Sequence, residues 1–121
     1  MILVDTSVWV DHLRAGDAEL VALLDRAQVL SHPFVIGELA CGNLRNRTEV
    51  LRLLQDLPQL PVANDAEVLF FIERHRLMGR GIGYVDNHLL AATALAAPAR
   101  LWTRDQRLAA VARDLTLAYD V

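Results

Sequence analysis

The chain has 121 residues, of which 54% are apolar, and it carries a formal net charge of −3 and a single cysteine. This length is typical of one domain, which we expect over residues 1–121, and it suffices to bury a hydrophobic core without disulfides. All 12 basic residues are arginine, which excludes Schiff-base catalysis and a P-loop phosphate site, because both require a lysine.

The composition also bounds where the protein works. No stretch of about 18 apolar residues is free of charge, and the N-terminus does not join a basic region to an apolar one. The single Cys41 lies in an apolar context and has no partner within the chain. We therefore expect a cytoplasmic protein in a reducing environment, without contact with a membrane. The mild negative charge argues against a strongly basic nucleic-acid binder but not against a local basic patch.

The first half of the chain alternates short apolar runs with stretches of helical periodicity. The run ILV predicts a buried strand, and Gly16 is expected to end the helix after it. Asp17 is placed to cap a second helix, and Pro33 fits the first position of a third. Besides the helix after Asp17, these signals predict strands at 2–4, 29–31 and 60–63 and helices at 6–14, 33–42 and 49–57.

The second half continues the alternation. Asp65 is expected to cap a long helix that runs to Arg80, where the glycines of GRGIG break it. The segment 85–97 is almost continuously apolar after His88, which predicts a buried helix. A strand at 101–103, a helix at 105–113 and a last strand at 117–119 follow. Strands that alternate with helices predict an α/β fold with a central parallel sheet flanked by helices.

Four acids interrupt apolar sequence, whereas most of the other acids occupy polar helix positions. Asp5 follows ILV, Glu38 lies within PFVIGELACG, Asp86 precedes HLLAATALAA, and Asp105 follows LWTR. Taken singly, Asp5 and Asp105 could cap the helices after them, and Asp86 could favour its helix dipole. Glu38, within a helix, could pair with an arginine. In a parallel sheet, however, ligands bind beyond the carboxyl ends of the strands, where Asp5 and Asp105 stand.

If these four acids, here called the acidic quartet, converge, their like charges need a partner. The chain has no lysine, and Arg104 is the single arginine within the four motifs. A divalent cation is then the natural partner, and a ligand set made only of oxygens favours Mg²⁺ or Mn²⁺ over Zn²⁺. Hydroxyl side chains that can orient the acids stand beside them, at Thr6, Ser7 and Thr103.

Four segments, in this order, resemble the motifs of the PIN domain: VDTSVW, GEL, YVDNHLLAA and LWTRD. The motif sequences are most similar to those of the VapC toxins of bacterial toxin–antitoxin pairs. The resemblance covers essentially the whole chain and implies a PIN-like α/β/α sandwich, an endoribonuclease dependent on Mg²⁺ or Mn²⁺ held by the quartet, a homodimer and a VapB-like antitoxin. One departure is Asn87, where many relatives carry an aromatic or aliphatic residue, so we expect a local change of packing.

The implied antitoxin would cover the acidic pocket and would need a hydrophobic groove, which we expect between the helices at 6–14 and 33–42. In the implied reaction, a metal-activated water hydrolyses RNA and leaves a 5′-phosphate and a 3′-hydroxyl. Attack by the 2′-hydroxyl would need a histidine pair, and the placement of the four histidines indicates no clear one. For RNA contact we single out five arginines, with ordinary solvated helix ends as the alternative: Arg45, Arg47, Arg74, Arg76 and Arg80.

Other proteins that gather acids at strand ends fit poorly. A receiver domain needs a lysine near its acidic pocket, and a haloacid-dehalogenase-type phosphatase needs an aspartate where Ser7 stands, as well as a lysine. The alternative from a different class is a catalytically silent PIN-like module that only binds RNA or protein. Loss of one quartet acid would favour that alternative, and all four are present.

Overall fold

The computed structural model describes residues 1–121 and arranges them as a three-stranded parallel sheet with seven helices. The strand order is β2-β1-β3, so the first strand is central, and Leu3 pairs with Leu30 on one side and Leu101 on the other. The elements are β1 (Ile2–Val4), α1 (Thr6–Ala15), α2 (Ala18–Asp25), β2 (Val29–Leu30), α3 (Pro33–Ala40), α4 (Arg47–Asp56), α5 (Asp65–His75), α6 (Tyr84–Leu95), β3 (Arg100–Trp102) and α7 (Gln106–Asp114).

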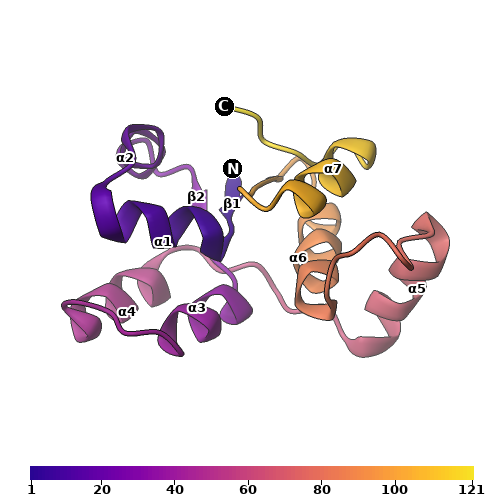
Figure 1. Ribbon diagram of the computed structural model, residues 1–121, viewed down its shortest axis with the longest axis horizontal. Coiled ribbons are helices and arrows are strands. Elements are labelled where there is room, and N and C mark those ends of the chain that lie inside the picture. The colour runs from indigo at the N-terminus through magenta and orange to yellow at the C-terminus, as the bar shows by residue number, and fades with distance from the viewer.

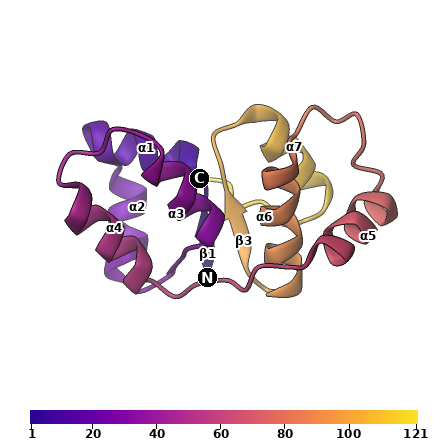
Figure 2. The ribbon, with the colours of Figure 1, turned by 90° about the horizontal axis from the view of Figure 1, so that it is seen from below.

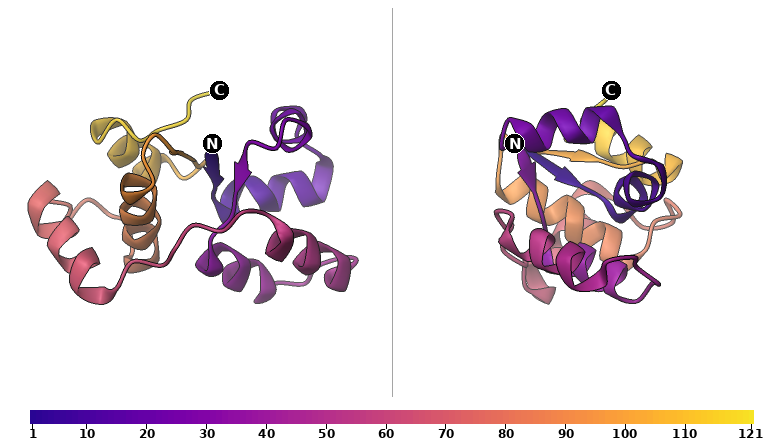
Figure 3. Two further views of the ribbon diagram at one scale, coloured as in Figure 1. Left: turned by 180° about the vertical axis from the view of Figure 1, so that it is seen from behind. Right: turned by 90° about the vertical axis from the view of Figure 1, so that its left-hand side faces the viewer.

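The helices form two groups on opposite sides of the strands, which confirms the predicted α/β architecture (Figures 1 and 2). Helices α1 to α4 lie on one side, and α5, α6 and α7 lie on the other, with α5 outermost. The left view of Figure 3 shows the segment 57–64 crossing below the strands from the first group to the second. Ser31 holds this segment, because its N–H donates to Pro58 and its carbonyl accepts from Leu60, each at 2.8 Å.

The hydrophobic core lies between the sheet and both groups of helices. Leu3 and Val4 of the central strand and Val8 of α1 are fully buried, and burial of such a side chain stabilises the fold by about 1.5–3 kcal/mol. Helix α6 is buried at every residue from Asn87 to Thr93, as its apolar sequence predicted. No helix of the structure is both long enough and apolar enough to cross a membrane.

The helix ends show which local signals act as predicted. Gly16 ends α1 with a φ of 77°, and Asp17 caps α2 by accepting from a backbone N–H of that helix at 2.9 Å. The predicted cap of α5 is wrong, because Asn64 and not Asp65 is its N-cap. Asn64 and Glu67 exchange two hydrogen bonds in a capping box, which leaves Asp65 as the first helical residue.

The predicted end of helix α5 at Arg80 is wrong, because the helix ends at His75. Arg76 adopts the left-handed conformation, with a φ of 53°. The N–H of Leu77 then returns to the carbonyl of Ile72 at 3.0 Å, and the Leu77 side chain is buried. Because such a stop is usually made by glycine or asparagine, the residue types did not indicate it.

Two of the predicted strands are reduced to single bridges. Ser31 pairs with Gln59, and Leu101 pairs with Ala118, but neither 60–63 nor 117–119 forms a strand. Pro61 lacks the N–H that a longer ladder on the 60–63 segment would need. The remaining predicted elements are present, with ends that differ by less than one helical turn.

Candidate acidic site

The acidic quartet stands on elements that meet at one edge of the sheet. Asp5 follows β1 and occupies the N-cap position of α1, and Asp105 occupies the N-cap position of α7 after β3. Asp86 lies in the first turn of α6, and Glu38 lies within α3. Because β1 and β3 are parallel neighbours, their carboxyl ends lie at the same edge, where ligands bind in open parallel sheets.

Asp5 is buried, with 6% of its surface exposed, and its carboxylate does not cap α1. No backbone N–H of that helix donates to it. Its Oδ2 atom instead accepts hydrogen bonds from the hydroxyls of Ser7 at 2.8 Å and Thr103 at 2.7 Å. Two hydroxyls, one from α1 and one from the segment after β3, therefore fix the orientation of this carboxylate.

Glu38 is exposed on α3 and reaches back to the start of α1. Its Oε1 atom accepts a hydrogen bond from the hydroxyl of Thr6 at 2.7 Å. No arginine forms a salt bridge with it, so the alternative interpretation of Glu38 as one half of an ion pair is wrong. Thr6, Ser7 and Thr103 thus each bind a quartet carboxylate.

Asp86 and Asp105 are held by backbone groups at the starts of their helices. The Oδ2 atom of Asp86 accepts from the N–H of Gly83 at 3.2 Å, and the Oδ1 atom of Asp105 accepts from a backbone N–H of α7 at 2.9 Å. Burial raises the pKa of Asp86 above its usual value, and the negative charges of the other three quartet carboxylates raise it further, against the Gly83 bond that lowers it. All three therefore lie within electrostatic range of Asp86.

Each quartet carboxylate is bound through one oxygen and keeps the other free of hydrogen bonds. The free atoms are Oδ1 of Asp5, Oε2 of Glu38, Oδ1 of Asp86 and Oδ2 of Asp105. Anionic oxygens of this kind are the donors that Mg²⁺ and Mn²⁺ prefer, so the residues present fit a divalent cation. No three His, Cys, Asp or Glu side chains lie close enough together to hold a metal ion, so the quartet would have to contract around one.

Arg104, the one arginine within the quartet's motifs, bonds to other acids. Its guanidinium donates to Asp11 at 2.8 Å and forms a second ion pair with Asp17. It also lies over the ring of Trp102, with Cζ 5.5 Å from the ring centroid. We call Arg104, Asp11 and Asp17 the Arg104 clamp. Neither the spacing nor the residue types indicated it, since Asp17 is also a helix cap and Asp11 occupies an ordinary polar position of α1.

The five arginines predicted to contact RNA differ in whether their guanidinium groups already have partners within the chain. Arg47 donates to backbone carbonyls at the end of α3, and Arg80 forms a salt bridge with an aspartate of α7 at 2.8 Å. Arg45, Arg74 and Arg76 are exposed and make no hydrogen bond or salt bridge. Only these last three have guanidinium groups that are free for a ligand.

A further arginine, which the sequence motifs did not indicate, lies across the loop before α6. Gly81 has a φ of 80°, and a Cβ atom there would approach Cδ of Arg107 to 2.8 Å. Arg107 belongs to α7, two positions after Asp105. The positive φ favours glycine at this position, and its lack of a side chain leaves room for the Arg107 side chain to lie against the loop that leads to Asp86.

Several buried polar side chains around α6 lack hydrogen-bond partners. His32 and His88 are both buried, and the ring of Phe34 packs against each of them. The Nδ1 atom of His32 caps α3, whereas its Nε2 atom and Nδ1 of His88 have no partner. Burial, and then the nearby His88, lower the pKa of His32 to about 4. The fold thus brings together two histidines that the sequence did not pair, but it buries them in the interior.

Asn87 is the residue at which the motif departs from many relatives. It is buried, and its amide donates to the carbonyl of Gly83 at 2.9 Å. Its Oδ1 atom has no partner. The polar side chain therefore packs against the same turn that holds Asp86.

A groove of about 640 Å³ lies between α1, α3 and α4, and it includes the space between the helices at 6–14 and 33–42 where a hydrophobic groove was predicted. Apolar side chains from all three helices line it, and Thr6 and Glu38 of the acidic site form part of its wall. Arg14 and Arg45 also line it. The groove therefore joins an apolar surface to Glu38 of the acidic quartet.

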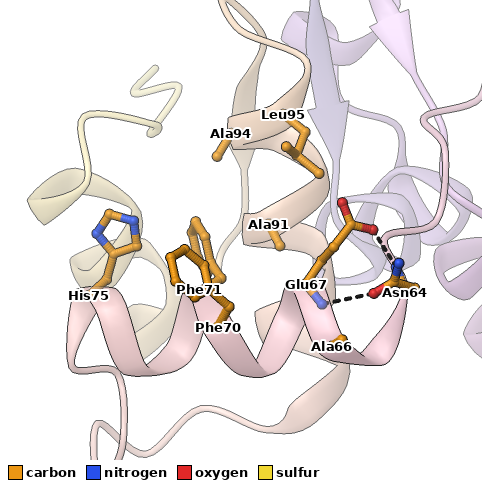
Figure 4. Close-up of a pocket in the computed structure, with 9 residues that line it drawn as sticks. All are labelled: Asn64, Ala66, Glu67, Phe70, Phe71, His75, Ala91, Ala94 and Leu95. Carbon is orange, nitrogen blue, oxygen red and sulfur yellow. Dashed lines mark hydrogen bonds between the residues drawn. The ribbon is translucent and has the colours of Figure 1, made fainter.

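A second pocket, of about 520 Å³, lies between α5 and α6 and is mainly apolar. Figure 4 shows Phe70 and Phe71 of α5 beside Ala91, Ala94 and Leu95 of α6. The side chains at its rim are unusually exposed for apolar residues, with 66% of Phe70 and 68% of Leu95 accessible. No quartet acid lines this pocket, so it is a surface feature separate from the acidic site.

Comparisons with known proteins agree with this fold and site. The sequence model of the PIN domain family matches residues 2–114. The chain is 53% identical over 118 residues to Ribonuclease VapC32 from two strains of Mycobacterium tuberculosis, an alignment that covers 98% of this chain and 95% of that protein.

Solved structures with a similar fold include FitAB bound to an IR36 DNA fragment, with a TM-score of 0.65, 20% identity and coverage of 93% of this chain and 91% of that one. They also include FitAcB from Neisseria gonorrhoeae, with a TM-score of 0.65, 24% identity and coverage of 93% and 94%. The sandwich is thus PIN-like. By its sequence match and by its identity to VapC32, the chain belongs to the PIN domain family and, within it, to the VapC-type proteins.

Proposed function

We propose that the chain is the toxin of a VapBC toxin–antitoxin pair and acts as an endoribonuclease dependent on Mg²⁺ or Mn²⁺. The observation that carries this proposal is the acidic quartet, in which each carboxylate keeps one oxygen free and none is paired with an arginine. The raised pKa of Asp86, which burial and the like charges cause, indicates a site that favours an added cation. The name Ribonuclease VapC32 of the 53% identical relative supports RNA as the substrate.

In this proposal the quartet holds the cation through its free oxygens. A bound divalent cation would lower the pKa of a water molecule and stabilise negative charge on the phosphoryl oxygens. Ser7 and Thr103 keep Asp5 in place, and Thr6 does the same for Glu38. A carboxylate oxygen that is not a ligand can accept the proton of the attacking water. Hydrolysis of this kind leaves a 5′-phosphate and a 3′-hydroxyl.

RNA would be bound by arginines around the acidic site. Arg45 supports this best, because it lines the same groove as Glu38 and its guanidinium is unoccupied. Arg74 and Arg76 are also exposed and unoccupied, at the end of α5. The planar guanidinium group matches the geometry of phosphate oxygens, so these three residues are the proposed phosphate contacts.

A catalytically silent module that only binds RNA or protein is the alternative. It is favoured by one observation, which is that no three acidic or histidine side chains lie close enough to hold a metal ion. A cleavage assay separates the two functions. Purified protein is incubated with total RNA in Mg²⁺ or in EDTA, beside the Asp5→Asn variant, and the product ends are mapped.

The proposal predicts cleavage that requires Mg²⁺, that Asp5→Asn abolishes, and that gives 5′-phosphate ends. A 2′-deoxy sugar at the scissile position should not stop it, because water and not the 2′-hydroxyl attacks. Products with 2′,3′-cyclic phosphate, or equal cleavage in EDTA, would contradict the metal mechanism. No cleavage of any RNA by folded protein would favour the silent module.

The antitoxin would occupy the groove between α1, α3 and α4. The groove offers an apolar wall and is also lined by the carboxylate of Glu38, and an arginine from the partner could form bidentate bonds with that carboxylate. The test is growth after expression of the chain alone, of its Asp5→Asn variant, and of the chain with the product of the neighbouring gene. We expect the chain alone to arrest growth, the Asp5→Asn variant not to arrest it, and the neighbouring gene's product to relieve the arrest.

Two matched variants locate the groove in the same growth assay. Val10 lines the groove and is 47% exposed, whereas Val21 lies on α2, outside the groove, and is 44% exposed. Val10→Glu should prevent relief by the antitoxin, and Val21→Glu should not. A harmless wild-type chain at verified soluble levels would refute the toxin assignment, even if the fold is right.

We also propose a homodimer that buries the apolar surface around Phe70 and Leu95. Apolar side chains this exposed are unusual unless another surface covers them. Sedimentation at tens of micromolar, a working range of about 10⁻⁵ M for a standard interface, should show a dimer. Phe70→Ser should give a monomer, while Leu53→Ser, at an exposed leucine of α4, should not. A wild-type monomer would contradict this part of the proposal.

A further inference from the structure

Arg104 is placed where it could neutralise the acidic quartet, yet it does not. It stands between Thr103 and Asp105, and its backbone N–H donates to the hydroxyl of Ser7 at 3.0 Å. Ser7 in turn donates to Asp5 at 2.8 Å. A single serine side chain therefore separates the main chain of Arg104 from the most buried carboxylate of the quartet.

Two acids outside the quartet take the guanidinium instead. Asp11 on α1 accepts from one terminal nitrogen at 2.8 Å, and Asp17 before α2 accepts from the other. Asp17 cannot easily follow the arginine elsewhere, because its Oδ1 atom caps α2 and only 16% of its side chain is exposed. The ring of Trp102 covers the guanidinium from one side.

We propose that Asp11 and Asp17 hold Arg104 away from the acidic quartet and so keep the quartet available for a divalent cation. This inference rests on the proposed function, since it concerns access to the same metal site. An unheld guanidinium beside Asp105 would form charge-assisted bonds with the quartet's free oxygens, because arginine pairs strongly with carboxylates. It would then compete with the cation for the same charge.

A purely structural role for the clamp predicts something different. If the clamp only fixed the segment 103–105, removal of either side of it would disturb Thr103 and Asp105 in the same way. Losing Arg104 and losing the two acids would then weaken metal binding alike. If the clamp holds Arg104 away, the two losses change the metal affinity in opposite directions. Losing the two acids weakens metal binding, whereas losing Arg104 does not, because it removes the competitor itself.

The experiment measures Mn²⁺ binding to the apo protein by calorimetry or electron paramagnetic resonance, without RNA. The variants are Asp11→Asn/Asp17→Asn, Arg104→Gln, and the three substitutions together. Asparagine keeps the size of both acids and can still cap α2 at position 17. The matched control is Asp25→Asn/Asp56→Asn, which removes two exposed acids and the same net charge elsewhere. Thermal melts establish that each variant is folded.

We expect Asp11→Asn/Asp17→Asn to bind Mn²⁺ about threefold to tenfold more weakly than the control variant, the range of a partly exposed charge interaction. Arg104→Gln should bind at least as tightly as wild type, and the triple variant should bind like Arg104→Gln. Equal weakening in Arg104→Gln and in the double variant would overturn the inference and leave the metal site in place. Wild-type protein that binds no Mn²⁺, or binds it equally after Asp5→Asn, would overturn the metal site and this inference with it.

Discussion

Two groups of carboxylates flank the segment between β3 and α7, and they differ in what neutralises them. In the Arg104 clamp, the bond from the N–H of Leu20 and then the bond from Arg104 lower the pKa of Asp17. In the acidic quartet, burial and then the neighbouring like charges raise the pKa of Asp86. One group is satisfied within the chain, and the other is left with unpaired charge. The two signs therefore distinguish Asp17, whose charge is paired within the chain, from Asp86, whose charge is not.

The largest effect is expected when one negative charge is removed from the quartet, because the unpaired charge of the quartet is what distinguishes it from the Arg104 clamp. Asp5→Asn keeps an oxygen that can accept from Ser7 and Thr103, but it removes the negative charge from the proposed ligand. We expect RNA cleavage to fall by about 10³-fold or more, as for loss of a main electrostatic contribution to catalysis. Initial rates on a defined RNA measure this.

The matched control is Asp56→Asn, at an exposed acid of α4 that makes no hydrogen bond. It should cleave at the wild-type rate. If Asp5→Asn protein were as active as this control, the quartet would not be the catalytic centre.

His32 adds a separate dependence of stability on pH. Burial lowers its pKa from 6.5 to about 4, so the unfolded chain takes up the proton first as the pH falls. The stability from neutral His32 is fully present above pH 6.5 and is lost as the pH falls toward 4, by about 3 kcal/mol.

His32→Asn should therefore lose less stability than wild type between pH 7 and pH 4, measured by urea unfolding. Asparagine still offers an acceptor for the cap of α3. His75→Asn, at an exposed histidine, should behave like wild type. The same acid loss in all three proteins would show that His32 is not the group responsible.

Removing a hydroxyl tests whether the quartet depends on the donors around it. Thr103→Val keeps the shape of the side chain but loses the bond to Asp5 and the acceptor for the N–H of Asp105, which lies at 3.1 Å. We expect cleavage to fall by about 10–100-fold, the usual effect of losing a group that orients a metal ligand. Thr48→Val, at an exposed threonine of α4, is the control. An effect below twofold would mean that Asp5 needs no such support.

The smallest predicted effect compares the two groups directly, in the stability of the apo protein at pH 7. Because the folded pKa of Asp86 is raised, its charge opposes folding above the unfolded pKa, so Asp86→Asn should raise the melting temperature. Because the folded pKa of Asp17 is lowered, its charge favours folding at pH 7, so Asp17→Asn should lower it. Each shift should be about 1–4 °C. Shifts of the same sign would contradict the comparison.

Most of the architecture could be predicted because local chemistry determines it. Apolar runs, helical periodicity and residues such as Gly16 and Asp17 placed the major elements in the right order. The placement of Asp5 and Asp105 at the same edge of the sheet also followed, since they come after parallel strands that are neighbours. That the four acids close around one cation stays a prediction. What failed were choices between similar residues, such as Asn64 and Asp65 at the start of α5, and short strands that depend on partners far along the chain.

The surroundings of the site could not be predicted, because contacts between distant segments create them. Arg104 is adjacent to Asp105 in sequence, yet its partners are Asp11, 93 residues away, and Asp17, 87 residues away. The buried pair of His32 and His88 arises in the same way, from α3 and α6 packing together. Sequence motifs indicated the four acids, but not the partners that Arg104 finds in the fold.

A crystal structure of the wild-type protein at saturating Mn²⁺ would show directly whether the acidic quartet binds a divalent cation. Anomalous scattering locates Mn²⁺ without reference to the fold. We predict a peak bound by free oxygens of Asp5, Glu38, Asp86 and Asp105, with Arg104 still paired to Asp11 and Asp17. Saturating Mn²⁺ with no peak among these four carboxylates, or a guanidinium in its place, would show that the quartet is not a metal site.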